Sequence, residues 1–200
     1  MNESAFKLIV VSSPDIFLGE GAVINELFDS GLDCFHLRKP NSTDEEIQLL
    51  IDDISPAFHD RIVLHHKMNL AENNNFKRLH INYSFFKAND LPLEKFKLSC
   101  SVHSWEEYQE VKEDVEYVFI SPVFDSISKP GYKAVTELHE IPVNKGAEII
   151  ALGGISSDNL LRAKEIGFDG VAVLGIIWEN PLSAKEKFLE LQKLLQNQIA

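Results

Sequence analysis

Ala151-Leu152-Gly153-Gly154-Ile155-Ser156-Ser157-Asp158 is one of two stretches that decide the fold class, and the other is Gly170-Val171-Ala172-Val173-Leu174-Gly175-Ile176. Each is a short apolar run typical of a β-strand that ends on glycine, and a helical pattern follows each one. Glycine leaves backbone N–H groups uncovered, and a following helix adds the positive end of its dipole. In a (β/α)8 barrel the loops after strands seven and eight form a phosphate site of this kind. The pair therefore predicts a phosphorylated ligand.

The same alternation of a β run with a turn or helix covers the whole chain. Eight short runs rich in Val, Ile, Leu and Phe are typical of buried parallel strands, and they are Lys7–Ser12, Asp33–Arg38, Arg61–His66, Arg78–Asn82, Lys97–His103, Tyr117–Phe124, Glu148–Gly153 and Gly170–Gly175. Helical patterns lie at Ala22–Ser30, Thr43–Ala57, Trp105–Glu113, Asp158–Ile166 and Leu182–Gln198. We expect shortened helices or turns after strands three and four. The pattern predicts one α/β domain over residues 1–200, a (β/α)8 TIM barrel, with an open doubly wound sheet as the alternative.

The composition restricts the class of protein and of partner. The 200 residues are 44% apolar and 25% charged, as in a globular domain, and are few for a barrel. The net charge of −12 disfavours nucleic acid and anionic membranes as partners. We find neither a membrane-spanning apolar run nor a signal-peptide pattern, and Cys34 and Cys100 lack CxxC spacing. We therefore expect a cytoplasmic protein with two reduced core thiols and small-molecule phosphate substrates.

Polar residues gather where the predicted strands end, which is where a barrel carries its site. Alternation places His36 on the same face as Arg38, and Ser101 on the same face as His103. Any single histidine has an alternative interpretation as a structural residue, but the set predicts a polar, basic mouth suited to phosphate. Five of the seven histidines lie at these ends: His36, His65, His66, His80 and His103.

The stretch Tyr117–Gly131, which contains the end of strand six and the loop that follows it, is a second candidate for anion binding. It carries the hydroxyls of Ser126 and Ser128, the cation Lys129 and a Pro-Gly turn. Such a loop can close over a substrate. The alternative is a solvated loop with an ordinary surface lysine.

Together these motifs resemble the thiamin phosphate synthase/TenI family over nearly the whole chain. The matching segments are His36–Arg38, Leu79–Ile81, Ser101–Ser104, Ser121–Phe124, Ser126–Lys129, Leu152–Ile155 and Gly170–Gly175. The resemblance implies a (β/α)8 barrel and a transferase that uses Mg²⁺ to join a thiazole phosphate to a hydroxymethylpyrimidine pyrophosphate. The TenI branch of the family includes a thiazole tautomerase. Barrels of this family often associate, so the resemblance is compatible with a homo-oligomer.

The resemblance also implies that different residues bind the two phosphate groups of the substrates. The thiazole phosphate would be held by the backbone amides of Gly153, Gly154, Leu174 and Gly175. The pyrophosphate would be held by Arg38 and Lys129, with the hydroxyls of Ser101, Ser126 and Ser128 beside it. The implied chemistry is an SN1-like departure of pyrophosphate followed by attack of the thiazole nitrogen. Such a step needs stabilisation of the leaving group's charge more than it needs a general base.

Several positions depart from the synthase pattern. Lys39 follows Arg38 directly, where synthases have Arg-x-Lys, and alternation points Lys39 to the opposite face. His66 stands where synthases have a magnesium-binding aspartate, and Asn82 begins a stretch without the second carboxylate. Neutral imidazole suits Mg²⁺ poorly. Asp125 is the nearby acid by position, so the residues predict no defined metal ligand set.

Three functions remain open from the sequence: a synthase, a TenI-like thiazole isomerase, and a non-catalytic binder of thiazole phosphate. His36 and the Ser101–Ser104 run resemble the TenI branch, but Pro122 stands where the tautomerase has its histidine. We hypothesise that His36, His66 and His103 supply a proton-shuttling group. The synthase-like loop after strand six favours the synthase, and another phosphosugar enzyme on the same barrel is the out-of-family alternative.

Overall fold

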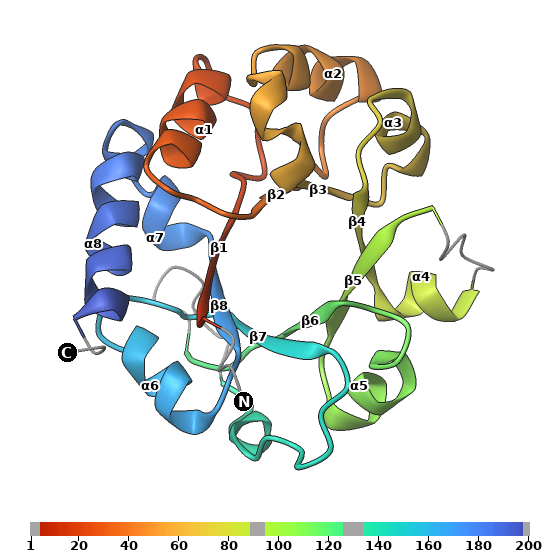
Figure 1. The fold of residues 1–200 in the computed structure, drawn as a ribbon, viewed down its shortest axis with the longest axis vertical. Coiled ribbons are helices and arrows are strands. Elements are labelled where there is room, and N and C mark those ends of the chain that lie inside the picture. The colour runs from red at the N-terminus through yellow and green to blue at the C-terminus, as the bar shows by residue number, and fades with distance from the viewer. Residues whose placement is uncertain (1–4, 89–94, 126–133, 198–200) are drawn as a thin grey trace.

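The computed structural model describes residues 5–88, 95–125 and 134–197. Eight parallel strands close into a barrel in chain order, which confirms the predicted (β/α)8 architecture and excludes the open sheet. Figure 1 shows the strands as a central ring with the helices around it. The strands are β1 (Lys7–Val11), β2 (Phe35–Leu37), β3 (Ile62–His65), β4 (Arg78–Asn82), β5 (Lys97–Val102), β6 (Tyr117–Ile120), β7 (Glu148–Leu152) and β8 (Gly170–Val173).

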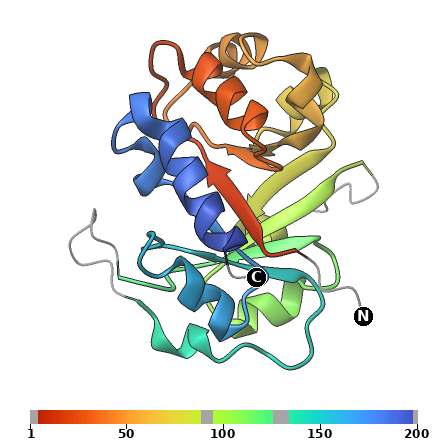
Figure 2. The ribbon, with the colours of Figure 1, turned by 60° about the vertical axis from the view of Figure 1, so that its left-hand side comes forward.

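Most of the helices are short, which explains how so few residues complete a barrel. They are α1 (Glu20–Asp29), α2 (Asp44–Asp52), α3 (Met68–Asn73), α4 (Tyr83–Ala88), α5 (Trp105–Val111), α6 (Leu160–Ile166), α7 (Gly175–Trp178) and α8 (Ala184–Gln196), with 3-10 turns η1 (Pro56–Arg61), η2 (Thr136–His139) and η3 (Pro181–Ser183). The shortened helices expected after strands three and four are confirmed as α3 and α4. Figure 2 shows α8 along the outside of the barrel, where it packs against α1, α6 and α7.

The start of α2 follows directly from the sequence. The Thr43 hydroxyl accepts a hydrogen bond from the Glu46 N–H at 3.2 Å, and the Glu46 carboxylate accepts one from the Thr43 N–H at 2.8 Å. This reciprocal pair satisfies donors that the first helical turn leaves free. It fixes where the chain leaves the mouth of the barrel after β2.

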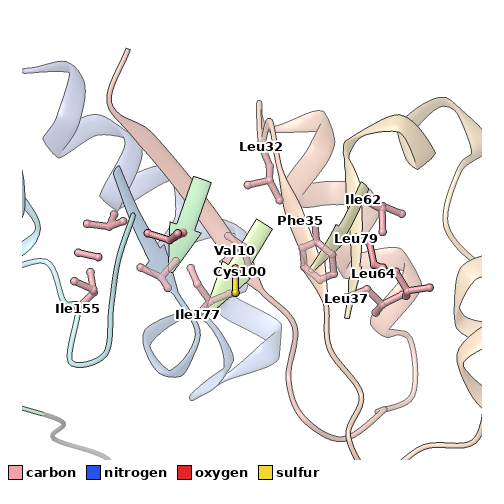
Figure 3. Close-up of a cluster of buried hydrophobic side chains, with 14 of the residues drawn as sticks. Val10, Leu32, Phe35, Leu37, Ile62, Leu64, Leu79, Cys100, Ile155 and Ile177 are labelled. Carbon is pink, nitrogen blue, oxygen red and sulfur yellow. The ribbon is translucent and has the colours of Figure 1, made fainter. Parts of the chain in front are cut away.

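Alternation along the strands divides the buried side chains into two layers. The layer between strands and helices is apolar, and Figure 3 shows part of it, with Phe35 and Leu37 of β2 beside Ile62 and Leu64 of β3. His36 lies between Phe35 and Leu37 in the sequence and therefore faces the barrel interior. The outer layer thus fixes which side chains point inward.

The barrel interior has an apolar side and a polar side. The apolar side is a buried cluster made of Ile9, Val11, Tyr117, Phe119, Ile150 and Ala172. The strands β2 to β5 instead contribute imidazoles and hydroxyls, described below. This asymmetry places the polar chemistry next to β2, β3, β4 and β5.

Two further expectations can be compared with the fold. Cys100 is buried and Cys34 partly buried, and both are free thiols as expected. Burial raises the pKa of the Cys100 thiol to about 12. Within the described ranges, no helix has the length and apolar character needed to cross a membrane.

Candidate active site

His36 is the centre of a hydrogen-bond network inside the barrel. Its side chain is fully buried, and its Nδ1 lies 2.9 Å from His65 Nε2. Its Nε2 lies 2.6 Å from the Tyr117 hydroxyl, which comes from β6 on the opposite part of the ring. Both nitrogens of this imidazole are therefore engaged, one by a side chain of β3 and the other by a side chain of β6.

His80 is held in the same way by β5. Its Nδ1 lies 2.8 Å from Ser99 Oγ and its Nε2 2.7 Å from Ser101 Oγ. The strand register pairs His80 with His65 on one side and with Ser99 on the other. The His65 and His80 rings stack at 4.3 Å, and Phe119 packs against His80 at 4.7 Å between ring centroids. Parallel pairing thus stacks inward side chains of successive strands.

Burial sets the protonation of these three imidazoles. Desolvation, reinforced by His80, lowers the pKa of His36 well below its usual value, and desolvation reinforced by His80 and His36 does the same to His65. Desolvation, with smaller effects of His66 and Arg38, lowers the pKa of His80 to about 3. The three rings are neutral near pH 7. The expected basic mouth therefore needs correction, because these buried histidines supply no positive charge.

Arg38 supplies positive charge at the rim instead. Its side chain is exposed, and its backbone is fixed to Ser12: the Arg38 N–H donates to Ser12 Oγ at 2.9 Å, and that hydroxyl donates to the Arg38 carbonyl at 2.9 Å. Partial desolvation and the Arg38 charge together lower the pKa of His66. Lys39 points away, as predicted, because its buried ammonium lies 2.6 Å from both carboxylate oxygens of Glu20.

His66 and His103 lie at the rim and are not bonded to His36. His66 has a positive φ of 56°, and its N–H donates to the His80 carbonyl at 3.0 Å. His103 is exposed, with Nδ1 2.9 Å from the Ser121 carbonyl. The structure therefore separates the predicted trio and groups His36 with His65 and His80 instead.

His65, His80 and Tyr117 surround His36, but they were not predicted from the sequence as residues of the catalytic site. The sequence indicates both histidines only as residues at the ends of predicted strands. The signal that finds them is the parity of each strand. Leu64 and Leu79 face the helices, so the residue after each of them must face inward.

The local structure explains why glycine occupies the two positions after β7. Gly153 and Gly154 have φ values of +93° and +67°, and a Cβ on Gly154 would lie 2.4 Å from the Phe124 carbonyl oxygen. Side chains are excluded there because the segment after β6 crosses closely. That segment is pinned by hydrogen bonds from Val123 N–H to the Leu152 carbonyl at 3.0 Å and from Phe124 N–H to the Gly153 carbonyl at 3.1 Å.

The loop after β8 lies beside this glycine pair. β7 and β8 are paired with Leu152 opposite Ala172, so the residues that follow each strand leave the barrel side by side. Leu174 precedes α7, and Gly175 is its first residue. The first N–H groups of a helix lack partners within the helix. The two glycine-ended segments therefore meet at one place on the mouth, as the sequence predicts.

Among the described residues, the donors at the ends of β3 and β4 do not fit the Mg²⁺ expected from the family resemblance. His66 and Asn82 stand at the ends of β3 and β4, and Asn82 Oδ1 accepts the Phe85 N–H at 2.8 Å. The Asp125 carboxylate accepts the Ala134 N–H at 2.7 Å, which joins the two flanks of segment 126–133. Mg²⁺ requires oxygen ligands, carboxylates above all. The predicted Ser126, Ser128 and Lys129 lie outside the described residues.

Comparison with known proteins agrees with this geometry. Residues 8–177 match the family described as thiamine monophosphate synthase. The chain is similar to a thiamine phosphate pyrophosphorylase from Bacteroides thetaiotaomicron, with 36% identity, a TM-score of 0.80, and coverage of 96% of this chain and 98% of that one. It is 26% identical to a thiamine-phosphate synthase of Desulfitobacterium hafniense (strain Y51), over 92% of each chain. A thiamine phosphate pyrophosphorylase from Pyrococcus furiosus, 18% identical, shares the fold with a TM-score of 0.78 over 99% of both chains. The chain belongs to the thiamine monophosphate synthase family.

Proposed function

We propose that this chain is a transferase of thiamin biosynthesis that joins a thiazole phosphate to a hydroxymethylpyrimidine pyrophosphate and releases pyrophosphate. The observation that carries the proposal is the pair of glycine-ended segments that meet after β7 and β8, in a chain of this family. The names of the relatives from Bacteroides thetaiotaomicron and Desulfitobacterium hafniense support the same activity. The proposal treats residues 1–200 as one cytoplasmic domain.

In this proposal the thiazole phosphate binds to backbone amides of Gly153, Gly154, Leu174 and Gly175. Backbone N–H groups are suited to a phosphate because they bring no side-chain bulk between the chain and the ligand. The positive φ values of Gly153 and Gly154 turn this backbone in a way that other residues rarely adopt. A local site of this kind is needed because the net charge of −12 repels anions from the protein as a whole.

The pyrophosphate is assigned to the cationic rim. Arg38 presents a guanidinium from a backbone fixed by Ser12, and a guanidinium can bind phosphate oxygens in a bidentate way. Lys129, Ser126, Ser128 and Ser101 are proposed as further donors. These groups would stabilise the charge that develops as the pyrophosphate leaves.

The histidines are assigned by their position. His36 is buried and neutral, so we assign it to hydrogen bonding beneath the reacting groups. His66 and His103 are exposed at the rim and are the candidates for moving a proton. Since the donors at β3 and β4 do not suit Mg²⁺, we expect the reaction to depend weakly on a metal site of the protein.

Calorimetry tests this assignment. We expect the full chain to bind thiazole phosphate and, separately, inorganic pyrophosphate, each measured with and without Mg²⁺. Arg38→Met should weaken pyrophosphate binding by about 10-fold or more and leave thiazole phosphate binding unchanged. The matched control is Arg162→Met, at an exposed arginine of α6, which should change neither affinity.

Two outcomes would contradict the synthase assignment. Binding of thiazole phosphate without any pyrophosphate site would favour a TenI-like isomerase. In that case, His66 and His103 become the residues to substitute while exchange of a thiazole proton is followed. Binding of neither ligand would remove the thiamin assignment altogether.

A further inference from the structure

His36, His65 and His80 come from three adjacent strands and meet inside the barrel. One ring nitrogen of each lies within 4.8 Å of the others. His36 and His80 are fully buried, and the three rings pack against one another at centroid distances of 4.3 to 5.1 Å. Three imidazoles in such a compact arrangement can present one nitrogen each to a single metal ion.

We propose that His36, His65 and His80 form a binding site for a divalent transition-metal ion of the zinc type. Imidazole nitrogen is a good ligand for Zn²⁺ and Co²⁺ and a poor one for Mg²⁺. Three protein ligands leave a fourth tetrahedral position for water or for an atom of a bound molecule. The proposed site uses different residues and different chemistry from the magnesium position considered above, and it does not depend on the proposed transferase activity.

The outer partners of the rings support this proposal. A metal-binding histidine normally engages its second nitrogen with a neighbouring polar group, which orients the ring. His36 presents Nδ1 to His65, while its Nε2 lies 2.6 Å from the Tyr117 hydroxyl. His80 has Ser99 at one nitrogen and Ser101 at the other, so whichever nitrogen coordinates, the other keeps a hydroxyl partner.

Binding of a metal ion would only move protons between ring nitrogens, and no proton would have to leave the network. His36 Nδ1 and His65 Nε2 lie 2.9 Å apart, so one proton lies between them when no ion is bound. With an ion bound, both of these nitrogens coordinate, so the proton moves to the other nitrogen of its own ring: to His36 Nε2, where the Tyr117 oxygen accepts it, or to His65 Nδ1. The Tyr117 hydroxyl in turn lies 3.7 Å from Cys34 Sγ.

Metal titration of the full chain, without substrates, tests the proposal. After chelator treatment and dialysis, we expect one Zn²⁺ per chain by calorimetry and the visible absorption bands of tetrahedral Co²⁺. Mg²⁺ should give no such site. His36→Gln and His65→Asn should each weaken Zn²⁺ binding by about 100-fold or more. Glutamine and asparagine are polar side chains no larger than histidine, so we expect the barrel to fold.

Two further variants and two possible results decide whether the three histidines bind Zn²⁺. His59→Gln alters a histidine of η1 that bonds the Ile54 carbonyl, outside the cluster, and should leave Zn²⁺ affinity unchanged. Tyr117→Phe keeps all three rings and should weaken binding about 10-fold. The proposal is overturned if the wild-type chain binds no Zn²⁺, or if His36→Gln and His65→Asn bind it as the wild type does. Neither result would bear on thiazole phosphate or pyrophosphate binding.

Discussion

Lowering the pH is expected to destabilise the fold through the buried histidines. The pKa of His80 is about 3 in the folded protein and about 6.5 in an unfolded chain. Since the folded-state pKa is depressed, the unfolded chain binds more protons between these two values. The stabilisation from a neutral His80 is thus fully present above pH 6.5 and is lost as the pH falls toward 3.

The size of the effect follows from the pKa difference. Each such histidine costs about 1.4 kcal/mol of unfolding free energy per pH unit below about 6.5. Between pH 7.5 and 5.5, His80 alone lowers the unfolding free energy by about 1.4 kcal/mol. His36 and His65 act in the same direction because their pKa values are also lowered by burial. The three together can remove at most about 4 kcal/mol over this range.

Urea unfolding in the presence of a chelator measures this loss directly. Fluorescence of Trp105 and Trp178 reports unfolding at each pH, and most carboxyl groups of an unfolded chain titrate below the chosen range. His80→Asn should reduce the pH-dependent loss by about 1.4 kcal/mol. The matched control is Ile150→Val in the apolar interior, which should cost about 1 kcal/mol at every pH.

A wild-type loss well below 1.4 kcal/mol between pH 7.5 and 5.5 would refute the reasoning, because the histidines would then be protonated in the fold or hydrated. An equal slope in His80→Asn and wild type would assign the loss to other groups.

Three further perturbations have definite expected outcomes. Lys39→Met leaves the Glu20 carboxylate buried without its ammonium partner and should lower the free energy of unfolding in urea by about 3–5 kcal/mol. The double variant Glu20→Gln/Lys39→Met should recover most of this loss. Equal stability of Lys39→Met and the double variant would contradict the reasoning. Gly154→Ala combines a φ of +67° with a contact of 2.4 Å and should abolish thiazole phosphate binding and destabilise the fold by more than about 1 kcal/mol. Gly19→Ala, at φ +82° with no neighbouring atom within 4 Å, is the control that carries the backbone strain alone and should retain that binding. Ser99→Ala removes one hydroxyl from His80 and should weaken Zn²⁺ binding about 10-fold by calorimetry, and an unchanged affinity would exclude Ser99 as an orienting partner.

The fold could be predicted from the sequence because its signals are local. The apolar runs that end on glycine and the Thr43 cap each lie within a few residues, and the structure places a strand within every predicted run. The direction of Lys39 also followed from simple alternation, and its pairing with Glu20 explains how a lysine remains charged when buried.

The histidine cluster could not be predicted in the same way, because it depends on contacts between strands. Parity along each strand indicates that His65 and His80 point inward, but the register of β3 with β4 is needed to show that they lie opposite each other. His66 has a left-handed backbone conformation, with a φ of 56°, and β3 ends at His65, so the alternation of side chains along the strand does not hold at His66. The rings are neutral because they are buried, and the extent of their burial cannot be predicted from the sequence at the end of a single strand.

The most direct measurement of the proposed activity is formation of thiamin phosphate from thiazole phosphate and hydroxymethylpyrimidine pyrophosphate. We expect the wild-type chain to release one pyrophosphate for each product molecule, Arg38→Met to be at least about 100-fold slower, and Arg162→Met to match the wild type. The absence of product from a folded wild-type chain that binds both phosphate ligands, with and without Mg²⁺, would contradict the assignment of this barrel as a synthase.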